Sequence, residues 1–379
     1  MLDKIKTNLL ANLRNIPGWK TKRKILVFES DDWGTVRMPS KEVQEKLVKL
    51  GINADKNYYN NNDSLESNDD MTALFEVLSR HKDKNGRHAV FTPISLVANP
   101  DFKKIKENNF KEYFYEPVTE TFKNYGPSHD KVYDLWKEGI DKNLFVPQSH
   151  GREHLNVKRW MEALNGDFPV TKTCFDYNFF GLSDTESNES RGEFLAAVDI
   201  DDVSENAGLA KILKEGFDLF EKLLGYRAQY FVAPNSLMNT GLEKDLNEMG
   251  INYLIGSRNQ PESLGHGKYK NNFRYIGKKN EHGQTFLVRN SQFEHGQSLE
   301  RYGYDKCLKD IQIAFKWNKP AIISTHRVNY IGYINEKNRK QGLEQLDMLL
   351  KNIVKKWPDV EFMTSIELGE LITTVKNAD

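Results

Sequence analysis

Residues 25–34 read Ile-Leu-Val-Phe-Glu-Ser-Asp-Asp-Trp-Gly, so four apolar residues run directly into a polar segment with two adjacent carboxylates, Asp31 and Asp32. A short apolar run followed by turn-forming residues is typical of a buried strand of a parallel sheet. Similar runs recur along the chain, and most are separated by stretches with the three- and four-residue spacing of amphipathic helices. We therefore predict an α/β fold with a parallel sheet. Strands are expected at residues 25–28, 89–91, 144–146, 194–198, 230–232, 253–255, 286–288, 321–323 and 360–363.

The number of strand–helix units indicates the architecture. Seven or eight units favour a parallel (β/α) barrel over an open sheet. Residues 99–143 and 156–226 are longer than a minimal crossover requires, so we expect long loop insertions there. The predicted organisation is a basic N-terminal helix (1–23), a single barrel (24–370) and a C-terminal tail (371–379). Helices are expected at residues 41–50, 71–80, 209–224, 242–249, 304–317 and 340–357.

Charge and cysteine content exclude several classes of protein. The 379 residues contain 54 Lys plus Arg and 54 Asp plus Glu, which leaves no net charge and argues against binding of nucleic acid through a basic excess. No apolar run of 18 residues is present, so no transmembrane helix is expected. Cys174 and Cys307 lack a CxxC spacing and are predicted to be reduced, structural thiols.

Apolar residues recur at three- and four-residue steps between Leu2 and Ile16, which predicts a short amphipathic helix. Through Lys24 the segment carries seven Lys or Arg residues against one Asp. Such a helix either docks on its own domain or makes a weak contact with an anionic membrane surface. The segment lacks the apolar core and cleavage site of a secretory signal, so we expect a cytoplasmic protein, with peripheral membrane contact as an alternative.

Three of the predicted strand ends carry residues capable of chemistry. In parallel barrels the loops that leave the carboxyl ends of the strands build the active site. The first predicted strand leads into Asp31 and Asp32, the third into His150 and His154, and the eighth into His326. We expect these three junctions to converge on one pocket.

His150 and His154 are four residues apart, and on a helix or helical turn this spacing places both imidazoles on one face, where they can chelate one ion. Two imidazoles and one carboxylate form a three-ligand site with open positions, as in catalytic sites for zinc or another divalent metal. Asp31 or Asp32 would supply the carboxylate. Without such convergence, the histidines would be surface residues of a helix, and the aspartates would be a helix cap or a solvated turn.

If both carboxylates face one pocket, one can bind the metal while the other removes a proton from a water molecule. For His326 two roles stay open: a hydrogen-bonded histidine at the barrel rim, or a general acid. Trp33 and Tyr230 are candidates either for stacking on a sugar or for packing in the barrel. Trp33, Arg327 and Asn235 follow predicted strands and are candidates for substrate contact.

With these residues assembled, the chain resembles the NodB-like polysaccharide deacetylases, which form carbohydrate esterase family four in the glycoside hydrolase/deacetylase barrel superfamily. The resemblance rests on the Asp-Asp pair, the HxxxH motif, a histidine motif near the end, and the closing pattern Phe-x-Thr-x-x-Glu-Leu at residues 362–368. It extends from about residue 24 to about residue 370. It implies a distorted barrel of about seven strand–helix units.

The resemblance also implies a role for each residue at the three junctions. It makes Asp31 the general base and His326 the general acid. It makes Asp32, His150 and His154 the ligands of a divalent metal, with zinc as the first choice. The implied reaction is hydrolysis of an acetyl group on an N- or O-acetylated sugar or polysaccharide, so the expected partner is an acetylated glycan.

The chain departs from the family pattern at several positions. Trp33 is inserted between the acidic pair and the following glycine, and Gly151 replaces the Ser or Thr expected after the first histidine. Residues 232–235, Val-Ala-Pro-Asn, stand where Arg-x-Pro-aromatic is expected, so the arginine that would support the base is missing there. Arg327 and Arg152 are the candidate replacements.

Two other functions stay open. A glycoside hydrolase of the same superfamily would need a second carboxylate about 5 to 9 Å from Asp31, and Asp176 and Glu294 are the candidates. A catalytically silent barrel would use the pocket only to bind carbohydrate. The missing arginine favours this third function, whereas the presence of both Asp-Asp and HxxxH argues against it.

Overall fold

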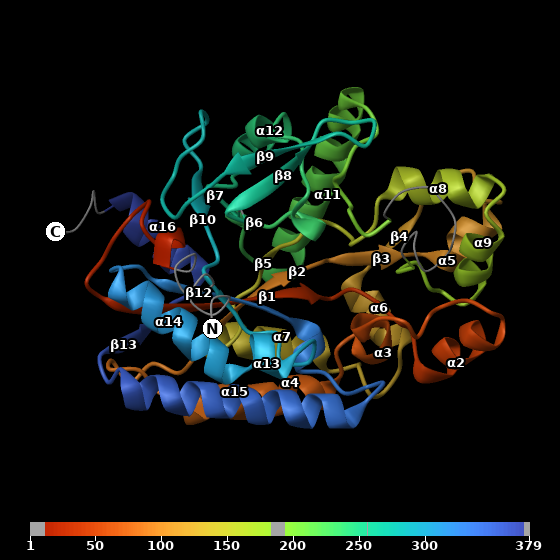
Figure 1. Ribbon diagram of the computed structural model, residues 1–379. Helices are drawn as coiled ribbons and strands as arrows, with labels where there is room; N and C mark the ends of the chain where they lie inside the picture. Colours follow the sequence, from red (N-terminus) through yellow and green to blue (C-terminus); the bar gives the residue numbers. More distant parts are fainter. Residues whose placement is uncertain (1–11, 183–193, 256, 375–379) are drawn as a thin grey trace.

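The computed structural model describes residues 12–182, 194–255 and 257–374, and Figure 1 shows a curled sheet flanked by helices. Nine strands form this sheet, and their pairings are parallel. In chain order they are β1 (Lys24–Trp33), β2 (Phe91–Ser95), β5 (Gln148–Ser149), β6 (Tyr230–Phe231), β7 (Tyr253–Ile255), β10 (Thr285–Leu287), β11 (Ser291–Gln292), β12 (Ala321–His326) and β13 (Val360–Phe362).

The strand order of the sheet is β10-β7-β6-β5-β2-β1-β12-β11, and β13 pairs with the first residues of β1. The strands β10 and β11 form the two edges, although only residues 288–290 separate them along the chain. A curled parallel sheet with two separate edges is a distorted half-barrel, which confirms the predicted α/β fold class with a barrel-like parallel sheet. The connection between β10 and β11, residues 288–290, contains Arg289, which contacts a carboxylate of the candidate site described below.

The six helices predicted between residues 41 and 357 are confirmed, and local capping explains where one of them starts. α4 begins at Asn68 rather than at Met71, because the Ser67 side chain caps it in a capping box with Asp70. The helices are α2 (Lys41–Lys49), α3 (Tyr58–Asn62), α4 (Asn68–Arg80), α5 (Phe102–Glu107), α6 (Val118–Asn124), α7 (Val132–Asp141), α8 (Val157–Asn165), α9 (Pro169–Asp176), α11 (Asn206–Leu224), α12 (Leu242–Glu248), α13 (Leu299–Tyr302), α14 (Tyr304–Lys316), α15 (Glu336–Lys356) and α16 (Ser365–Thr374).

The central strand β1 separates two apolar cores. Leu26 and Phe28 pack with residues of α4, α14 and α15, the helices that lie below the sheet in Figure 1. Ile25 and Val27 belong to the second core, which also contains residues of the other strands and of α11, α12 and α16. Because side chains alternate along a strand, β1 has an outer face of even-numbered residues and an inner face of odd-numbered residues.

Two strand predictions were wrong in existence or position. Residues 194–198 form buried turns, and part of this run packs in the apolar cluster of Trp160. An apolar run indicates burial, but a short one does not by itself identify a strand. The strand expected at residues 144–146 begins later, at Gln148, and Phe145 forms an isolated bridge to β2.

The two long stretches predicted as insertions lie mainly beside the carboxyl ends of β1 and β2 (Figure 1). Residues 99–143 contain most of the hairpin of β3 (Ala98–Pro100) and β4 (Tyr115–Pro117), followed by α6 and the crossover helix α7. Residues 156–226 contain α8, α9 and the crossover helix α11. An apolar cluster joins α5, α8 and α9, so this lobe is packed next to the strand ends that carry the candidate residues.

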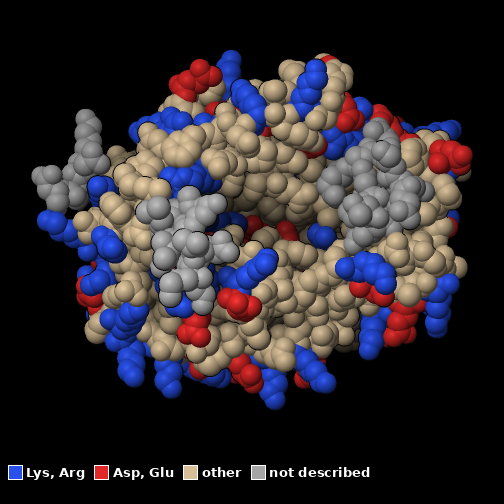
Figure 2. All heavy atoms as spheres, viewed as in Figure 1, with Lys and Arg blue, Asp and Glu red and all other residues tan. Residues whose placement is uncertain are grey.

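Most of the predicted N-terminal helix, and residues 375–379 of the predicted tail, lie outside the described residues. Within the described ranges, no helix combines the length and the apolar character needed to cross a bilayer. Cys174 and Cys307 are buried in different apolar clusters. On the face shown in Figure 2 the molecule is hollowed near its centre, and acidic side chains are visible at the floor of the hollow.

Candidate metal and catalytic site

A bulge at the end of β1 brings the two adjacent carboxylates to the same pocket. Strand alternation alone would direct Asp31 to the inner face and Asp32 to the outer face. The pairing of β1 with β2 shifts register between Ser30 and Trp33, and Asp32 has a φ of 77°. A β-bulge redirects side chains in this way, and both carboxylates line one cavity.

The bulge explains the inserted tryptophan. Trp33 is completely buried, its ring packs edge-on against Phe145, and its Nε1 donates a hydrogen bond to Ser30 Oγ at 2.9 Å. Gly34 follows with a φ of 86°, and a Cβ there would lie 2.3 Å from the Leu96 carbonyl oxygen, so only glycine fits. The prediction that Trp33 contacts substrate was therefore wrong, because the indole anchors the bulge from the core side.

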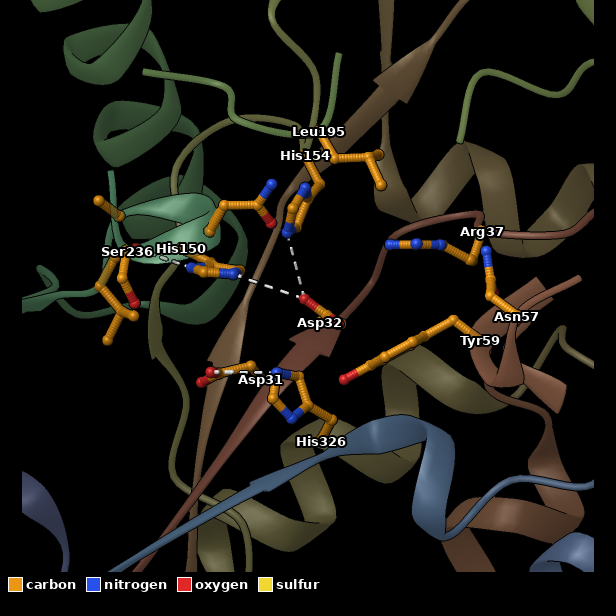
Figure 3. A pocket seen from close by; sticks show the side chains of 13 residues that line it. Asp31, Asp32, Arg37, Asn57, Tyr59, His150, His154, Leu195, Ser236 and His326 are labelled. Carbon is orange, nitrogen blue, oxygen red and sulfur yellow. Dashed lines mark hydrogen bonds and ion pairs between the residues drawn. The ribbon is translucent and has the colours of Figure 1, made fainter. Parts of the chain in front are cut away.

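Asp32, His150 and His154 form a compact set of potential metal ligands. Asp32 Oδ1 lies 3.5 Å from His150 Nε2 and 3.4 Å from His154 Nε2, and the three buried residues offer ligand atoms within 4.8 Å of one another (Figure 3). Two ligands of a tetrahedral zinc at 2.0–2.1 Å are about 3.3–3.4 Å apart. Asp32 Oδ1 is buried and has no hydrogen-bond partner among the described residues, which is the state expected of a ligand atom.

The histidines reach this position without a helix. Residues 150–154 form an irregular loop after β5, in which Gly151 has a φ of 109°, a conformation that Ser or Thr in its place would adopt only with strain. The prediction of a helical turn was therefore wrong. His150 Nδ1 donates to the Val232 carbonyl oxygen at 2.7 Å, which leaves the lone pair of Nε2 directed toward Asp32.

The protonation states also suit a metal. Burial raises the pKa of Asp32, but the two imidazoles beside it outweigh burial and hold that pKa well below 3.8. Burial lowers the pKa of His154 and so favours its neutral form. An ionised carboxylate with neutral imidazole is what metal binding requires, so these residues fit a divalent metal. Ligands of this kind suit zinc and also other divalent first-row metals.

Arg289 holds the second carboxylate in its ionised form. Its Nη1 and Nη2 donate to Asp31 Oδ2 and Oδ1, both at 2.6 Å, and its Nε donates to Glu29 Oε2 at 2.7 Å. Burial raises the pKa of Asp31, but the Arg289 guanidinium lowers it more, so it lies below 3.8. Sequence reasoning missed Arg289, although it directly follows the predicted strand 286–288 and so stands at a strand end.

The arginines expected to support the base do not do so. Arg327 is completely buried and donates to Asp63 and Glu66, which excludes both a contact with Asp31 and the predicted contact with substrate. Arg152 forms ion pairs with Glu153 and Glu215. Both predictions were wrong because a residue's place after a strand does not show which carboxylate it meets.

His326 is held as a cation at the same cavity. Its Nδ1 forms a hydrogen bond with Glu294 Oε1 at 2.6 Å, and its Nε2 lies 3.7 Å from Asp31 Oδ2. Burial lowers the pKa of His326, but Glu294 and the nearby aspartates outweigh burial and raise it to about 10. The side chain can therefore donate a proton from Nε2 at neutral pH.

The five residues of the three junctions line one cavity of about 260 Å³, together with Arg37, Tyr59 and Asn235. The structure thus brings all three junctions together, and it places Asn235 on the cavity wall. Tyr230 is fully buried instead, where its hydroxyl donates to Glu29 Oε2 at 2.9 Å. Of its two suggested roles, packing is the one that the structure supports.

No protein-family model and no curated protein matches the sequence. Among solved structures, the chain is similar to the PuuE allantoinase (12% identity, 96% of each chain, TM-score 0.47). It is also similar to a CE4 family pseudoenzyme from Bacillus anthracis (11% identity, 91% of this chain and 65% of that chain, TM-score 0.36).

A third similar structure is the 4-alpha-glucanotransferase of Thermococcus litoralis (13% identity, TM-score 0.43). The match covers 91% of this chain but only 40% of the glucanotransferase. At these identities the likenesses concern the fold alone.

Proposed function

We propose that this protein is a metal-dependent hydrolase that removes an acetyl group from an N- or O-acetylated sugar. The proposal depends on one observation: Asp32, His150 and His154, which could hold a metal, line a single cavity with the carboxylate of Asp31 and the imidazole of His326. These are the parts that hydrolysis of an amide or ester requires. The motifs shared with the NodB-like deacetylases support the same reaction and an acetylated glycan as substrate.

Each group has a separate part in the proposed mechanism. Asp32, His150 and His154 would hold the metal, most readily zinc, which supplies Lewis acidity to the acyl carbonyl and to the attacking water. Asp31 takes the proton of that water, since each carboxylate oxygen keeps a lone pair beyond its bond to Arg289. The bond from the acyl carbon to nitrogen or oxygen then breaks and acetate is released.

His326 completes the reaction by protonating the departing amine or alkoxide from Nε2. Glu294 is placed behind the ring, on Nδ1, and stabilises the imidazolium before the transfer. Asn329 Nδ2 donates to the other oxygen of Glu294 at 2.7 Å, so the orientation of the carboxylate is fixed. These contacts keep His326 protonated, so it is the candidate general acid.

The other two functions find less support in the geometry. Asp176 is exposed and pairs with Lys106 at 2.7 Å, and Glu294 is engaged by His326. Within the described residues, no carboxylate other than Asp31 and Asp32 lines the cavity, so a glycosidase lacks its second carboxylate. A barrel that only binds carbohydrate has no use for an ionised base beside a metal site.

The proposed function can be tested with a panel of N- and O-acetylated sugars. We expect acetate release by the metal-loaded protein and none after chelation, with activity restored by added zinc or another divalent ion. Cleavage of a glycosidic bond would instead identify a glycoside hydrolase. Binding without any turnover by the metal-loaded protein would identify a silent carbohydrate-binding barrel.

The ion pair between Glu294 and His326 predicts a pH effect. Activity requires His326 to be protonated, so kcat/KM should fall on the alkaline side as pH rises through the pKa of this group. Glu294→Gln removes a charge-assisted hydrogen bond worth about 1.5–3 kcal/mol, so the alkaline limb should move down by about one to two pH units. Profiles of kcat/KM against pH for both proteins test this, and an unmoved limb would exclude His326 as the acid.

A further inference from the structure

Arg37 is a cation on the cavity wall that forms no ion pair with any residue of the described ranges. It follows β1 and Gly34, and Figure 3 shows its guanidinium directed across the cavity toward Asp32 and His154. Its Nε is buried without a hydrogen bond, and within the described part of the chain no ion pair reaches this side chain. Arg37 instead makes a cation–π contact: its guanidinium carbon lies 5.1 Å from the centroid of the Tyr59 ring. An uncharged ring orients the guanidinium but does not neutralise its charge.

The four fully buried arginines of the described residues are all neutralised. Arg152, Arg159, Arg274 and Arg327 each donate to at least one carboxylate. A guanidinium keeps its charge under all ordinary conditions. When it is partly buried without a partner, no ion pair or hydrogen bond offsets the cost of its lost hydration. Arg37 is partly buried, and it differs from these four arginines in that no ion pair reaches it within the described residues and it faces the candidate active site.

Three carboxylates at or beside the cavity have other partners, although Asp63 Oδ2 accepts no hydrogen bond. Asp31 accepts both of its short bonds from Arg289, and Asp63 accepts from the buried Arg327. Asp32 belongs to the metal-ligand set. The charge of Arg37 is thus available to a molecule in the cavity.

We infer that Arg37 binds an anionic group of the substrate, so that the preferred substrate is an acidic acetylated sugar bearing a carboxylate or a phosphate. This inference depends on the proposed function. The planar fork of arginine donates two parallel hydrogen bonds to either group. Asn235 and Tyr59 also line the cavity and offer polar atoms to the neutral part of such a sugar.

The test compares matched sugars that differ only in charge: N-acetylglucosamine, its 1-phosphate and 6-phosphate, and N-acetylglucosaminuronic acid. We expect the metal-loaded wild-type protein to have at least a tenfold higher kcat/KM for one charged sugar than for the neutral one. Arg37→Met should lower the ratio of kcat/KM for the charged sugar to kcat/KM for the neutral sugar about 10- to 100-fold. Loss of a charge-assisted hydrogen bond has an effect of this size. The phosphate and uronate arms show which anion is preferred.

Arg80→Met is the matched control, because it removes the same charge from an exposed residue of α4 outside the cavity. It should leave the ratio of charged to neutral kcat/KM unchanged. Binding of the same sugars to the metal-loaded Asp31→Asn protein, measured by calorimetry, gives a readout that does not need turnover. In the Asp31→Asn background, Arg37→Met should weaken binding of the charged sugar about 10- to 100-fold more than binding of the neutral sugar.

The outcomes separate the two proposals. Equal kcat/KM for charged and neutral sugars, or a preference that Arg37→Met leaves intact, would overturn the anion site while acetyl hydrolysis stands. If no sugar releases acetate but the Asp31→Asn protein binds a charged sugar through Arg37, the anion site stands and the proposed hydrolysis is overturned.

Discussion

His150→Ala is expected to abolish metal binding and acetate release together, whereas Asp31→Asn should keep the metal and lose only the reaction. His150 supplies one of three ligands, and two ligands hold a divalent ion far less tightly. Asp31 lies beside the ligand set but is fixed by Arg289, and a general base contributes about 100- to 10,000-fold to the rate. Metal content by elemental analysis and kcat on one acetylated sugar would be measured for both variants.

A matched control is His81→Ala. His81 is a largely buried histidine that pairs with Asp347 at 2.9 Å, outside the cavity, so its loss should affect neither metal content nor kcat beyond a small effect of stability. Metal that persists at full stoichiometry in His150→Ala would contradict the proposed ligand set. Full activity of Asp31→Asn would show that another group is the base.

The sequence was sufficient to predict which residues of three strand ends share one cavity, but not how they meet. Asp31, Asp32, His150, His154 and His326 could be found because each stands just after an apolar run, and parallel strands end at a common edge. The bulge that turns Asp32 inward could not be predicted, since strand alternation alone separates adjacent side chains. It was visible only as an unexplained insertion.

Contacts between distant parts of the chain were the harder part. Asp31 and Arg289 are far apart in sequence, and their contact depends on which strands form the edges of the sheet. The same holds for Glu294, which was weighed only as a glycosidase carboxylate and instead holds His326. Arg327 and Arg152 were reasonable candidates by position, but the pairing of buried charges is decided by three-dimensional packing.

Short strands show a second limit of the sequence. β5 consists of Gln148 and Ser149, two polar residues that no hydrophobic pattern would identify. The apolar run at residues 194–198 has the composition of a strand, yet it forms buried turns. Burial could thus be predicted from these patterns, whereas the choice between strand and buried loop could not.

Arg289→Met is expected to cause the largest loss of stability among single substitutions at the site. Glu29 and Asp31 are both buried, and Arg289 is the cation that both of them contact. Breaking a buried ion pair by removal of one partner costs about 3–5 kcal/mol of unfolding free energy, because an uncompensated charge is left behind. Urea unfolding at pH 7 would measure the loss.

The pH dependence of that loss identifies its cause. In the wild type the pKa of Asp31 lies below its ordinary value, so its stabilising contribution is present above pH 4 and disappears only as pH falls further. In Arg289→Met the strongest opposition to burial is lost and only His326 and His150 still lower the pKa of Asp31, so this pKa rises. Protonation then relieves the buried charge, and the difference from wild type should shrink between pH 7 and pH 5. The triple variant Glu29→Gln, Asp31→Asn and Arg289→Met should recover much of the lost stability. It has no charged side chain at any of these three positions. A loss that is independent of pH, or no recovery in this triple variant, would show that Arg289 acts through packing of its side chain and not through its charge.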